Sequence, residues 1–408
     1  MRIFGKAGRG MAGAVGAAGL LLLAACSPLQ IGSRTLDFGD GSGNAQTIPS
    51  QTPMMPSGQA QTFGRGPVQV TLLLPLSGDP GLTSVGQSLA NASRMAIAFI
   101  EANPNIAENI TISLRDTGGT VAGATAAASA AMTSGAKLIL GPLTAAEVTA
   151  VGSMGRSNGV PVIGFSNNPT AASPGVYLLS VLPDMEMKRS LNWIRQQGRR
   201  GIAGVFPATE FGHAQEVAFR QQAVIAGFAP TAVYTFSTVE EAQQIVNQAL
   251  PQVQRGMIDT LYLPDRATAP SFGVLLAQAG ITPDMVQIVG SADWEGDPTI
   301  AASAQLSGAI YPAVDPAGMA AISGDYQRQF GGRPHALATI AYTAVILANV
   351  NTLSMSTPPY NPALMTSAQG FNGRDGVFRF LGNGKAEYAL VLKRVAAGGA
   401  QVVEPAGL

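Results

Sequence analysis

The folded part of this chain begins with Val68-Gln-Val-Thr-Leu-Leu-Leu-Pro-Leu76, an apolar run that ends at the turn signal Ser77-Gly-Asp-Pro80. A segment with helical spacing of its apolar residues follows from Thr83 to Glu101. Short apolar strands that alternate with amphipathic helices form parallel sheets covered on both faces. This opening therefore predicts a doubly wound α/β fold.

The same alternation continues along the chain. The last two expected strands flank Gly382-Asn-Gly384, which predicts a hairpin turn. Roughly ten strands favour two doubly wound lobes over a single sheet, because most sheets hold about half that number. Beyond the first, strands are expected at 110–114, 138–140, 161–165, 202–206, 231–236, 258–263, 286–289, 308–314, 376–380 and 387–394.

The composition excludes several classes of function. Charged residues make up 12% of the 408 residues, and 24 Lys and Arg balance 24 Asp and Glu. A nucleic-acid-binding protein needs a basic surface to displace counterions, so this class is excluded. The single cysteine, Cys26, excludes an intrachain disulfide and a cysteine-based metal cluster. The two histidines, His213 and His335, lie too far apart in sequence for a local ligand pair, so neither a metal nor a cofactor is expected.

The N-terminus is typical of an exported bacterial lipoprotein. Basic residues precede an uncharged apolar stretch from Met11 to Ala25, which is too short to span a bilayer. Leu23-Ala-Ala-Cys26 resembles the bacterial lipobox, so residues 1–25 are predicted to be a signal peptide and Cys26 the lipidated residue. An ordinary signal peptide with a chance cysteine is the alternative. Residues 26–66 lack apolar periodicity, which predicts a disordered tether behind the lipidated cysteine.

Two matches to catalytic motifs lack the required context. Gly155-Arg-Ser-Asn-Gly159 matches the G-x-S-x-G nucleophile elbow, which needs a strand before it and a helix after it. Here a helix is expected before it and a strand after it, which predicts a helix stop. Ser134-Gly-Ala-Lys137 matches S-x-x-K, but the sequence has neither S-D-N nor K-T-G. Without a coherent set of catalytic residues, the chain is predicted not to be an enzyme.

Together, the alternating lobes, the export signal and Leu74-Pro-Leu-Ser-Gly78 resemble the type I periplasmic binding proteins, whose prototypes bind leucine, isoleucine and valine. The resemblance covers nearly all of residues 68–405 and includes the closing segment Gly373–Gly384. It implies a Venus-flytrap fold of two doubly wound parallel-sheet lobes.

The resemblance also implies that the chain crosses between the lobes three times. These crossings are expected near 181–184, 307–314 and 358–362. The expected lobes are 67–182 plus 308–358 and 183–307 plus 359–405.

A narrower likeness connects several short motifs. Together they resemble penicillin-binding-protein activator lipoproteins, which implies a non-catalytic regulator of peptidoglycan synthesis with a class A penicillin-binding protein as partner. Ser27, after the lipidated cysteine, favours the periplasmic face of the outer membrane over the inner membrane. The alternative is a substrate-binding lipoprotein of an ABC transporter, with a branched-chain or related amino acid as ligand. The motifs are Leu72–Gly78, Asp116-Thr-Gly-Gly119, Gly135–Val148, Leu182–Glu186 and Glu210-Phe-Gly212.

In type I folds the ligand lies between the lobes, at the carboxyl ends of the strands. Thr144 and Ser166 offer hydroxyl groups for a ligand carboxylate, and Asp293 offers an acid for an ammonium group. Thr144 is also a predicted helix N-cap with Glu147 three residues on, the capping-box pattern. The alternative interpretation is that these are loop and capping residues of a closed or vestigial cleft. By position, the candidate cleft residues are Ser77, Gly78, Leu143, Thr144, Phe165, Ser166, Asn167, Phe211, Asp265, Asp293 and Trp294.

Overall fold

The computed structural model describes residues 60–229 and 232–407. Cys26 and the predicted signal peptide lie outside the described residues, so the lipid anchor stays a prediction. The prediction that the tether extends to residue 66 is wrong, because Gln61–Phe63 forms a strand, β1, that pairs with Ile112–Leu114. Phe63 packs against the core, a contact that a single apolar residue among glycines does not reveal in sequence. Within the described ranges, no helix is both long and apolar enough to cross a membrane.

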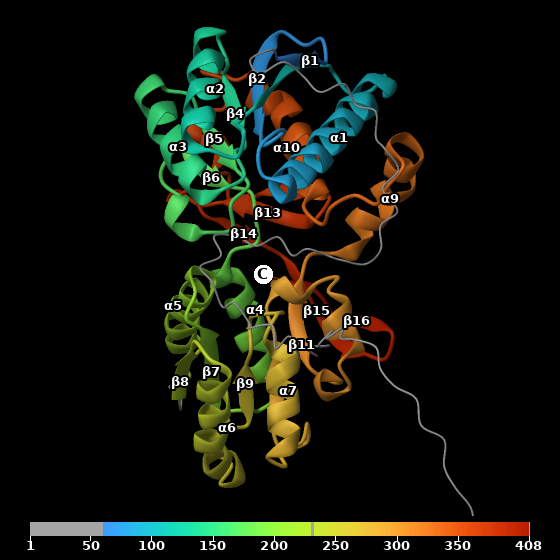
Figure 1. The fold of residues 1–408 in the computed structure, drawn as a ribbon. Helices are drawn as coiled ribbons and strands as arrows, with labels where there is room; N and C mark the ends of the chain where they lie inside the picture. Colours follow the sequence, from blue (N-terminus) through green and yellow to red (C-terminus); the bar gives the residue numbers. More distant parts are fainter. Residues whose placement is uncertain (1–59, 230–231, 408) are drawn as a thin grey trace, which may run out of the picture. The chain divides into compact units, whose positions relative to one another are not determined.

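Six strands form the first sheet, in the order β1-β3-β2-β4-β5-β6 (Figure 1). Only β1 runs antiparallel to its neighbour, and all other pairs are parallel. The strands are β1 Gln61–Phe63, β2 Val68–Leu74, β3 Ile110–Asp116, β4 Leu138–Leu140, β5 Val162–Gly164 and β6 Val176–Leu178.

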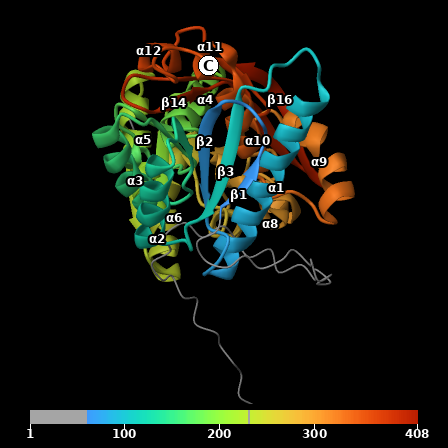
Figure 2. The same ribbon diagram turned by 90° about the horizontal axis from the view of Figure 1, so that it is seen from above.

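Helices cover both faces of this sheet, with α1 and α10 on one side and α2 and α3 on the other (Figure 2). Both faces need a cover because alternate side chains of each strand point to opposite sides. In β2, Leu72 and Leu74 belong to the core under α1 and α10, whereas Leu73 belongs to the core under α2 and α3. The helices of this lobe are α1 Pro80–Ala102, α2 Val121–Thr133, α3 Ala145–Asn158, η1 Pro169–Ala171, α9 Pro316–Phe330, α10 Ala338–Asn349, α11 Asn351–Ser354 and α12 Pro362–Met365.

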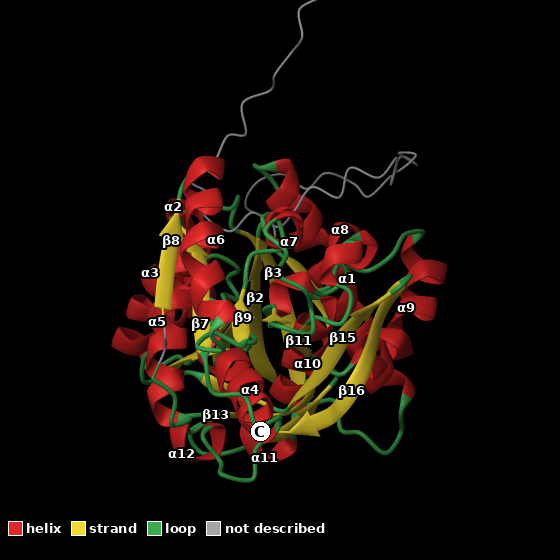
Figure 3. Cartoon of the chain, turned by 90° about the horizontal axis from the view of Figure 1, so that it is seen from below, coloured by secondary structure: helices red, strands yellow, loops and turns green. Residues whose placement is uncertain are grey.

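Seven strands form the second sheet, in the order β16-β15-β11-β10-β9-β7-β8 (Figure 3). The strands from β8 to β11 are parallel, and β15 and β16 are antiparallel to their neighbours. Its strands are β7 Ile202–Pro207, β8 Ala232–Phe236, β9 Thr260–Tyr262, β10 Gln287–Val289, β11 Ile310–Ala313, β15 Leu390–Ala396 and β16 Gly399–Gly407.

This sheet also has a core on each face. Tyr262 and Val289 pack with α4 and α5, whereas Leu261 and Ile288 pack with α6 and α7. The two predicted doubly wound lobes are therefore confirmed. The helices of this lobe are α4 Pro183–Gln196, α5 Glu210–Ile225, α6 Val239–Gln254, α7 Ala269–Gln278, η2 Ala292–Trp294, α8 Pro298–Ala302 and η3 Ala304–Leu306.

A small third sheet changes the expected lobe boundaries. It is antiparallel, with β12 Phe371–Gly373, β13 Gly376–Phe380 and β14 Ala386–Tyr388, and the predicted hairpin joins β13 to β14. Phe378, Phe380 and Tyr388 lie in the core of the first lobe, although 359–405 was expected in the second. The third crossing therefore follows β14, near Ala389, and not 358–362. Alternating apolar residues predict a buried face, but not the core that the face joins.

Strand β11 also differs from the prediction. Residues 308–358 were expected in the first lobe, but β11 pairs with β10 and β15 in the second sheet. The chain re-enters the first lobe only at α9, where Ile322 and Tyr326 join the first core. A four-residue apolar strand carries no signal for the sheet that it extends.

The G-x-S-x-G match is a helix stop, as predicted. Its residues end α3, and Gly159 is the left-handed C-cap with φ +67°. Ser157 Oγ bonds back to Ser153 O within the same helix.

Candidate binding site

Each large sheet has a point at which the strand order reverses. The chain passes from β2 to β3 on one side and then to β4 on the other, and it repeats this with β7, β8 and β9. In doubly wound folds, the loops at the carboxyl ends of the strands diverge at such switch points and form the ligand site. The sequence-predicted residues Ser77, Gly78, Leu143, Thr144 and Asp265 all lie on these loops.

Asp116, at the end of β3, organises the loop after β2. Its carboxylate accepts hydrogen bonds from Ser77 Oγ at 2.5 Å, Ser77 N at 3.2 Å, and the backbone N–H groups of Leu76 and Gly118, both at 2.8 Å. Burial alone would raise the pKa of Asp116, but these hydrogen bonds lower it below its ordinary value. Gly78 has φ +94°, and a Cβ there would lie 2.6 Å from Gly118 O, so the close approach of the two loops requires glycine.

A second carboxylate occupies the loop after β4. Thr144 is the N-cap of α3, and the predicted capping box with Glu147 is confirmed. Thr144 N and Thr144 Oγ1 donate to Glu147 Oε2 at 3.2 and 2.8 Å. Glu147 is buried, and its Oε1 has no hydrogen-bond partner among the described residues.

The loop after β5 reaches toward the second lobe. Ser166 is buried and its Oγ accepts a hydrogen bond from Asn168 N at 3.1 Å, while Asn167 is half-buried. Asn168 Nδ2 donates to Glu210 Oε1, in the first turn of α5, at 2.8 Å. This bond connects the first lobe to the second.

The corresponding edge of the second lobe is acidic. Asp265 accepts hydrogen bonds from Thr268, and Asp293 accepts one from Arg266 N at 3.2 Å. Arg266 Nε also lies 3.8 Å from Asp293 and 3.9 Å from Asp297. Burial raises the pKa of Asp293 to about 6, against the opposing effect of Arg266.

His335, in the segment before α10 of the first lobe, is close enough to Arg266 to respond to its charge. Burial, and then the guanidinium of Arg266, lower the pKa of His335. The acidic edge is thus approached from the first lobe by this side chain as well as by Asn168.

Glu186 is the buried acid of this edge. Its Oε2 accepts hydrogen bonds from Ala292 N at 3.0 Å and Gln215 Nε2 at 3.4 Å, and Gln215 Oε1 accepts one from Tyr262 OH at 2.6 Å. Burial, with a smaller contribution from the charge of Asp293, raises the pKa of Glu186 to about 7. A buried carboxyl group with such partners belongs either to a structural hydrogen-bond network or to a functional site.

Three of the predicted cleft residues lie below the edge. Leu143 and Phe165 belong to the hydrophobic core of the first lobe, and Trp294 belongs to that of the second. Their burial corrects the prediction that they line the surface of a cleft. Phe211, one turn before Gln215 on α5, is half-buried.

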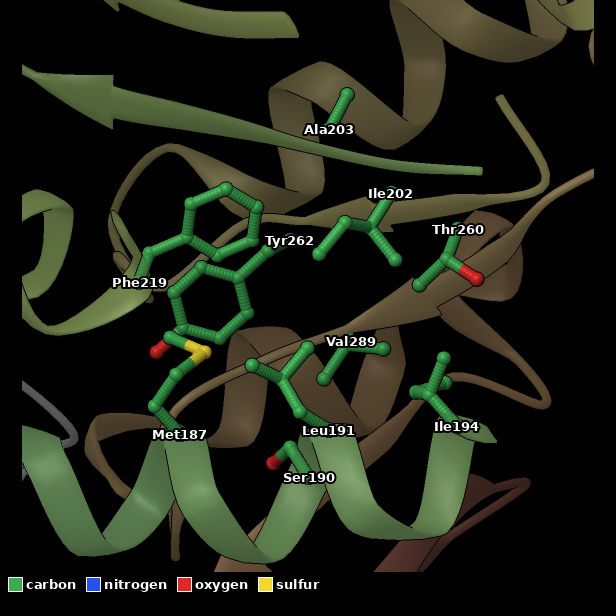
Figure 4. A pocket seen from close by; sticks show the side chains of 10 residues that line it. All are labelled: Met187, Ser190, Leu191, Ile194, Ile202, Ala203, Phe219, Thr260, Tyr262 and Val289. Carbon is green, nitrogen blue, oxygen red and sulfur yellow. The ribbon is translucent and has the colours of Figure 1, made fainter. Parts of the chain in front are cut away.

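Two cavities lie elsewhere in the second lobe. One, between α4 and the sheet, has a volume of about 10 Å³ and is bounded by Met187, Leu191, Phe219 and Tyr262 (Figure 4). That volume holds about one water molecule, so it is a packing defect and not a ligand site. The other, beside α7 and η3, has a volume of about 120 Å³ and a mainly apolar lining. Neither involves the acidic edge.

A two-lobed α/β protein with polar loops at both switch points has the architecture of a ligand-binding protein. The chain belongs to the periplasmic binding protein family, whose sequence profile matches residues 67–400. No curated protein matches the chain.

Solved structures share this fold at low sequence identity. A proposed branched-chain amino acid ABC transporter from Rhodospirillum rubrum aligns with a TM-score of 0.70 at 18% identity, covering 82% of this chain and 99% of that one. An ABC transporter substrate-binding protein from Desulfitobacterium hafniense, in complex with Leu, has a TM-score of 0.63 at 17% identity, with coverage of 82% and 99%. A solute-binding protein from R. palustris, in complex with benzoate, has a TM-score of 0.58 at 16% identity, with coverage of 84% and 98%.

Sequence reasoning missed Glu186 as a site residue, although a signal existed. The buried positions of α4 form one stripe, and Glu186 occupies it together with Met187, Ser190, Leu191 and Ile194. A carboxylate on an apolar stripe needs internal partners, so it marks either a structural network or a site. No comparable pattern identifies Arg266.

Proposed function

We propose that this protein is a periplasmic solute-binding protein that presents a small organic solute to an ABC importer. Family membership and the neighbours named as ABC transporter substrate-binding proteins support the proposal. It acts by binding alone, without catalysis. The lipid on Cys26 would hold it at the periplasmic face of the membrane.

The observation that carries this function is Glu186. A carboxyl group that is 6% exposed and has a pKa of about 7 is unfavourable at neutral pH unless a partner compensates for its charge. It lies at the edge where this fold binds ligands, beside Asp293 and the N–H of Ala292. A solute that donates hydrogen bonds or carries positive charge would relieve that unfavourable burial.

A thermal-shift screen of the full chain tests the proposal. A solute at 100 times its Kd stabilises the folded state by about 2.7 kcal/mol, which shifts the Tm of a lobe of this size by roughly 5–10 °C. We expect at least one solute to produce such a shift in the native chain and a smaller one in the Glu186→Gln variant. If amines, amino acids, aromatic acids and sugars at millimolar concentration all leave the Tm unchanged, solute binding is rejected.

A second candidate function is activation of a class A penicillin-binding protein at the outer membrane. The motif likeness favours it, and so does one observation: the hydroxyls of Ser77 and Thr144 are bonded to internal carboxylates. A regulator with a vestigial cleft would need no ligand there. The test is whether the full chain co-purifies with a class A synthase of the same cell and raises its glycan-polymerising rate. Failure in both assays rejects this function without affecting the first.

A further inference from the structure

The donors at the first-lobe edge are already bonded to carboxylates of the protein itself. A site for a ligand carboxylate needs free hydroxyl and N–H groups, and the loops after β2 and β3 supply such groups from Leu76, Ser77 and Gly118. All of them donate to Asp116, at 2.5–3.2 Å. The place of a bound carboxylate is therefore taken by an internal one.

The same arrangement recurs at the loop after β4. A helix N-terminus favours an anion, because its first N–H groups lack partners within the helix. At α3 the anion is Glu147, which accepts from Thr144 N and Thr144 Oγ1. Its other oxygen, Oε1, is buried and has no hydrogen-bond partner among the described residues, so Glu147 adds an unpaired acceptor beneath this edge.

The second-lobe edge has the same sign of charge. Three carboxyl groups gather there near one guanidinium, that of Arg266, which already lies within 4 Å of two of them. A ligand carboxylate would meet negative charge and hydrogen-bond acceptors from both lobes. The three carboxyl groups are those of Asp265, Asp293 and Asp297.

The geometry points to Asp116 and Glu147 as specificity-determining residues that exclude carboxylate ligands, so that the solute is an amine, amidine or guanidine without a carboxylate. This inference rests on the proposed solute-binding function and narrows its ligand class. It also departs from the amino-acid ligand that the sequence analysis gave for the transporter alternative, because an α-amino acid carries the carboxylate that the first lobe would reject.

Matched ligand series separate the contributions of the amino group and the carboxylate of an amino acid. Isothermal titration calorimetry on the full chain would compare leucine with 3-methylbutylamine and 4-methylpentanoate, and phenylalanine with 2-phenylethylamine and 3-phenylpropanoate. Arginine, agmatine and 5-guanidinopentanoate form a third series. We expect the amine to bind in at least one series, the amino acid to bind at least 10-fold more weakly, and the acid not to bind.

The outcomes distinguish this inference from the function on which it rests. If an amino acid or an acid binds most tightly within its series, the inference is overturned and the solute-binding function stands. If the only ligands found are sugars or other solutes without a basic nitrogen, the inference is likewise overturned and the solute-binding function stands. If no solute of any class binds, the function fails and takes the inference with it.

Variants of the internal carboxylates provide a second test. Asp116→Ala should release the donors of the β2 loop, raising the affinity for the acid by 10-fold or more while lowering that for the amine. Asp116→Asn and Glu147→Gln keep a hydrogen-bond acceptor for the loop, so they should stay folded even if Asp116→Ala does not. Each should weaken amine binding by about 10-fold, because each removes one negative charge. Glu240→Gln, an exposed acid on α6, is the matched control. Unchanged preference for amine over acid in all three variants would overturn the assignment.

Discussion

Replacing Glu186 by glutamine should remove a large pH dependence from the stability of the second lobe. Burial raises the pKa of Glu186 from 4.5 to about 7, so the folded state binds more protons than the unfolded state between these two values. The free energy of unfolding therefore falls as pH rises through this window. A pKa raised from 4.5 to about 7 corresponds to about 3 kcal/mol in total, of which about three quarters is lost between pH 5 and pH 8.

Glutamine keeps the shape of the side chain and an oxygen that can accept the Ala292 N–H group, but it does not ionise. The difference in unfolding free energy between pH 5 and pH 8 should therefore be about 2–3 kcal/mol smaller in Glu186→Gln than in the native chain. Burial also raises the pKa of Asp293 and of Asp375 to about 6, and both contribute in the same direction in either protein. The comparison between variants therefore reports Glu186 together with its interaction with Asp293.

Urea unfolding monitored by tryptophan fluorescence suits this measurement. The only two tryptophans of the sequence, Trp193 and Trp294, are both buried in the second lobe, so the signal reports the lobe that holds Glu186. Glu240→Gln should leave the native pH profile unchanged because that carboxylate is exposed. Parallel pH profiles for Glu186→Gln and the native chain would show that Glu186 is not a destabilised buried acid, and the argument for the site would lose its foundation.

Three further substitutions test other parts of the structure. Tyr262→Phe removes the hydroxyl that donates to Gln215 and should lower the unfolding free energy in urea by about 1–3 kcal/mol, because it leaves a buried acceptor unpaired. Gly290→Ala places a Cβ 2.3–2.5 Å from the Trp294 indole, so it should cost about 1–3 kcal/mol and alter the fluorescence spectrum, whereas Gly332→Ala, with open space around it, should not. Cys26→Ser should abolish labelling by radioactive palmitate and move the protein out of the membrane fraction; retained labelling would reject the lipobox.

The sequence was sufficient for the local pattern of the fold but not for its long-range assignments. Strand β4 is a continuous apolar run, and β2 ends in one, Leu72–Leu74, before a turn signal. This local pattern is independent of what lies elsewhere in the chain. The sheet that β11 joins also includes β15, about 80 residues further along the chain, and Phe378 enters a core that includes β2 and α1 at the start of the folded part. Single-residue properties give no signal for such distant partners.

In the candidate site, too, local features could be predicted from the sequence but long-range partners could not. The sequence places Ser77, Thr144 and Asp265 after strand ends, where the structure also has them, and their role in a site stays a prediction. The partner of Ser77 could not be predicted, because Asp116 lies 39 residues further along the chain and becomes its neighbour only through the parallel pairing of β2 with β3. What a hydroxyl can bind depends on whether it is already bonded, and that is a property of the folded state.

The bonds of Asp116 also set a limit on how this site could change its ligand. The carboxylate that repels a ligand anion is the same group that orders the backbone of Leu76, Ser77 and Gly118. Any substitution that frees these donors also removes the partner that positions them, and unpaired donors at a partly buried edge reduce stability. Selectivity and local order are therefore coupled at one residue. A variant that gained affinity for carboxylates would be less stable without ligand, and it would recover stability when an anion took the place of Asp116.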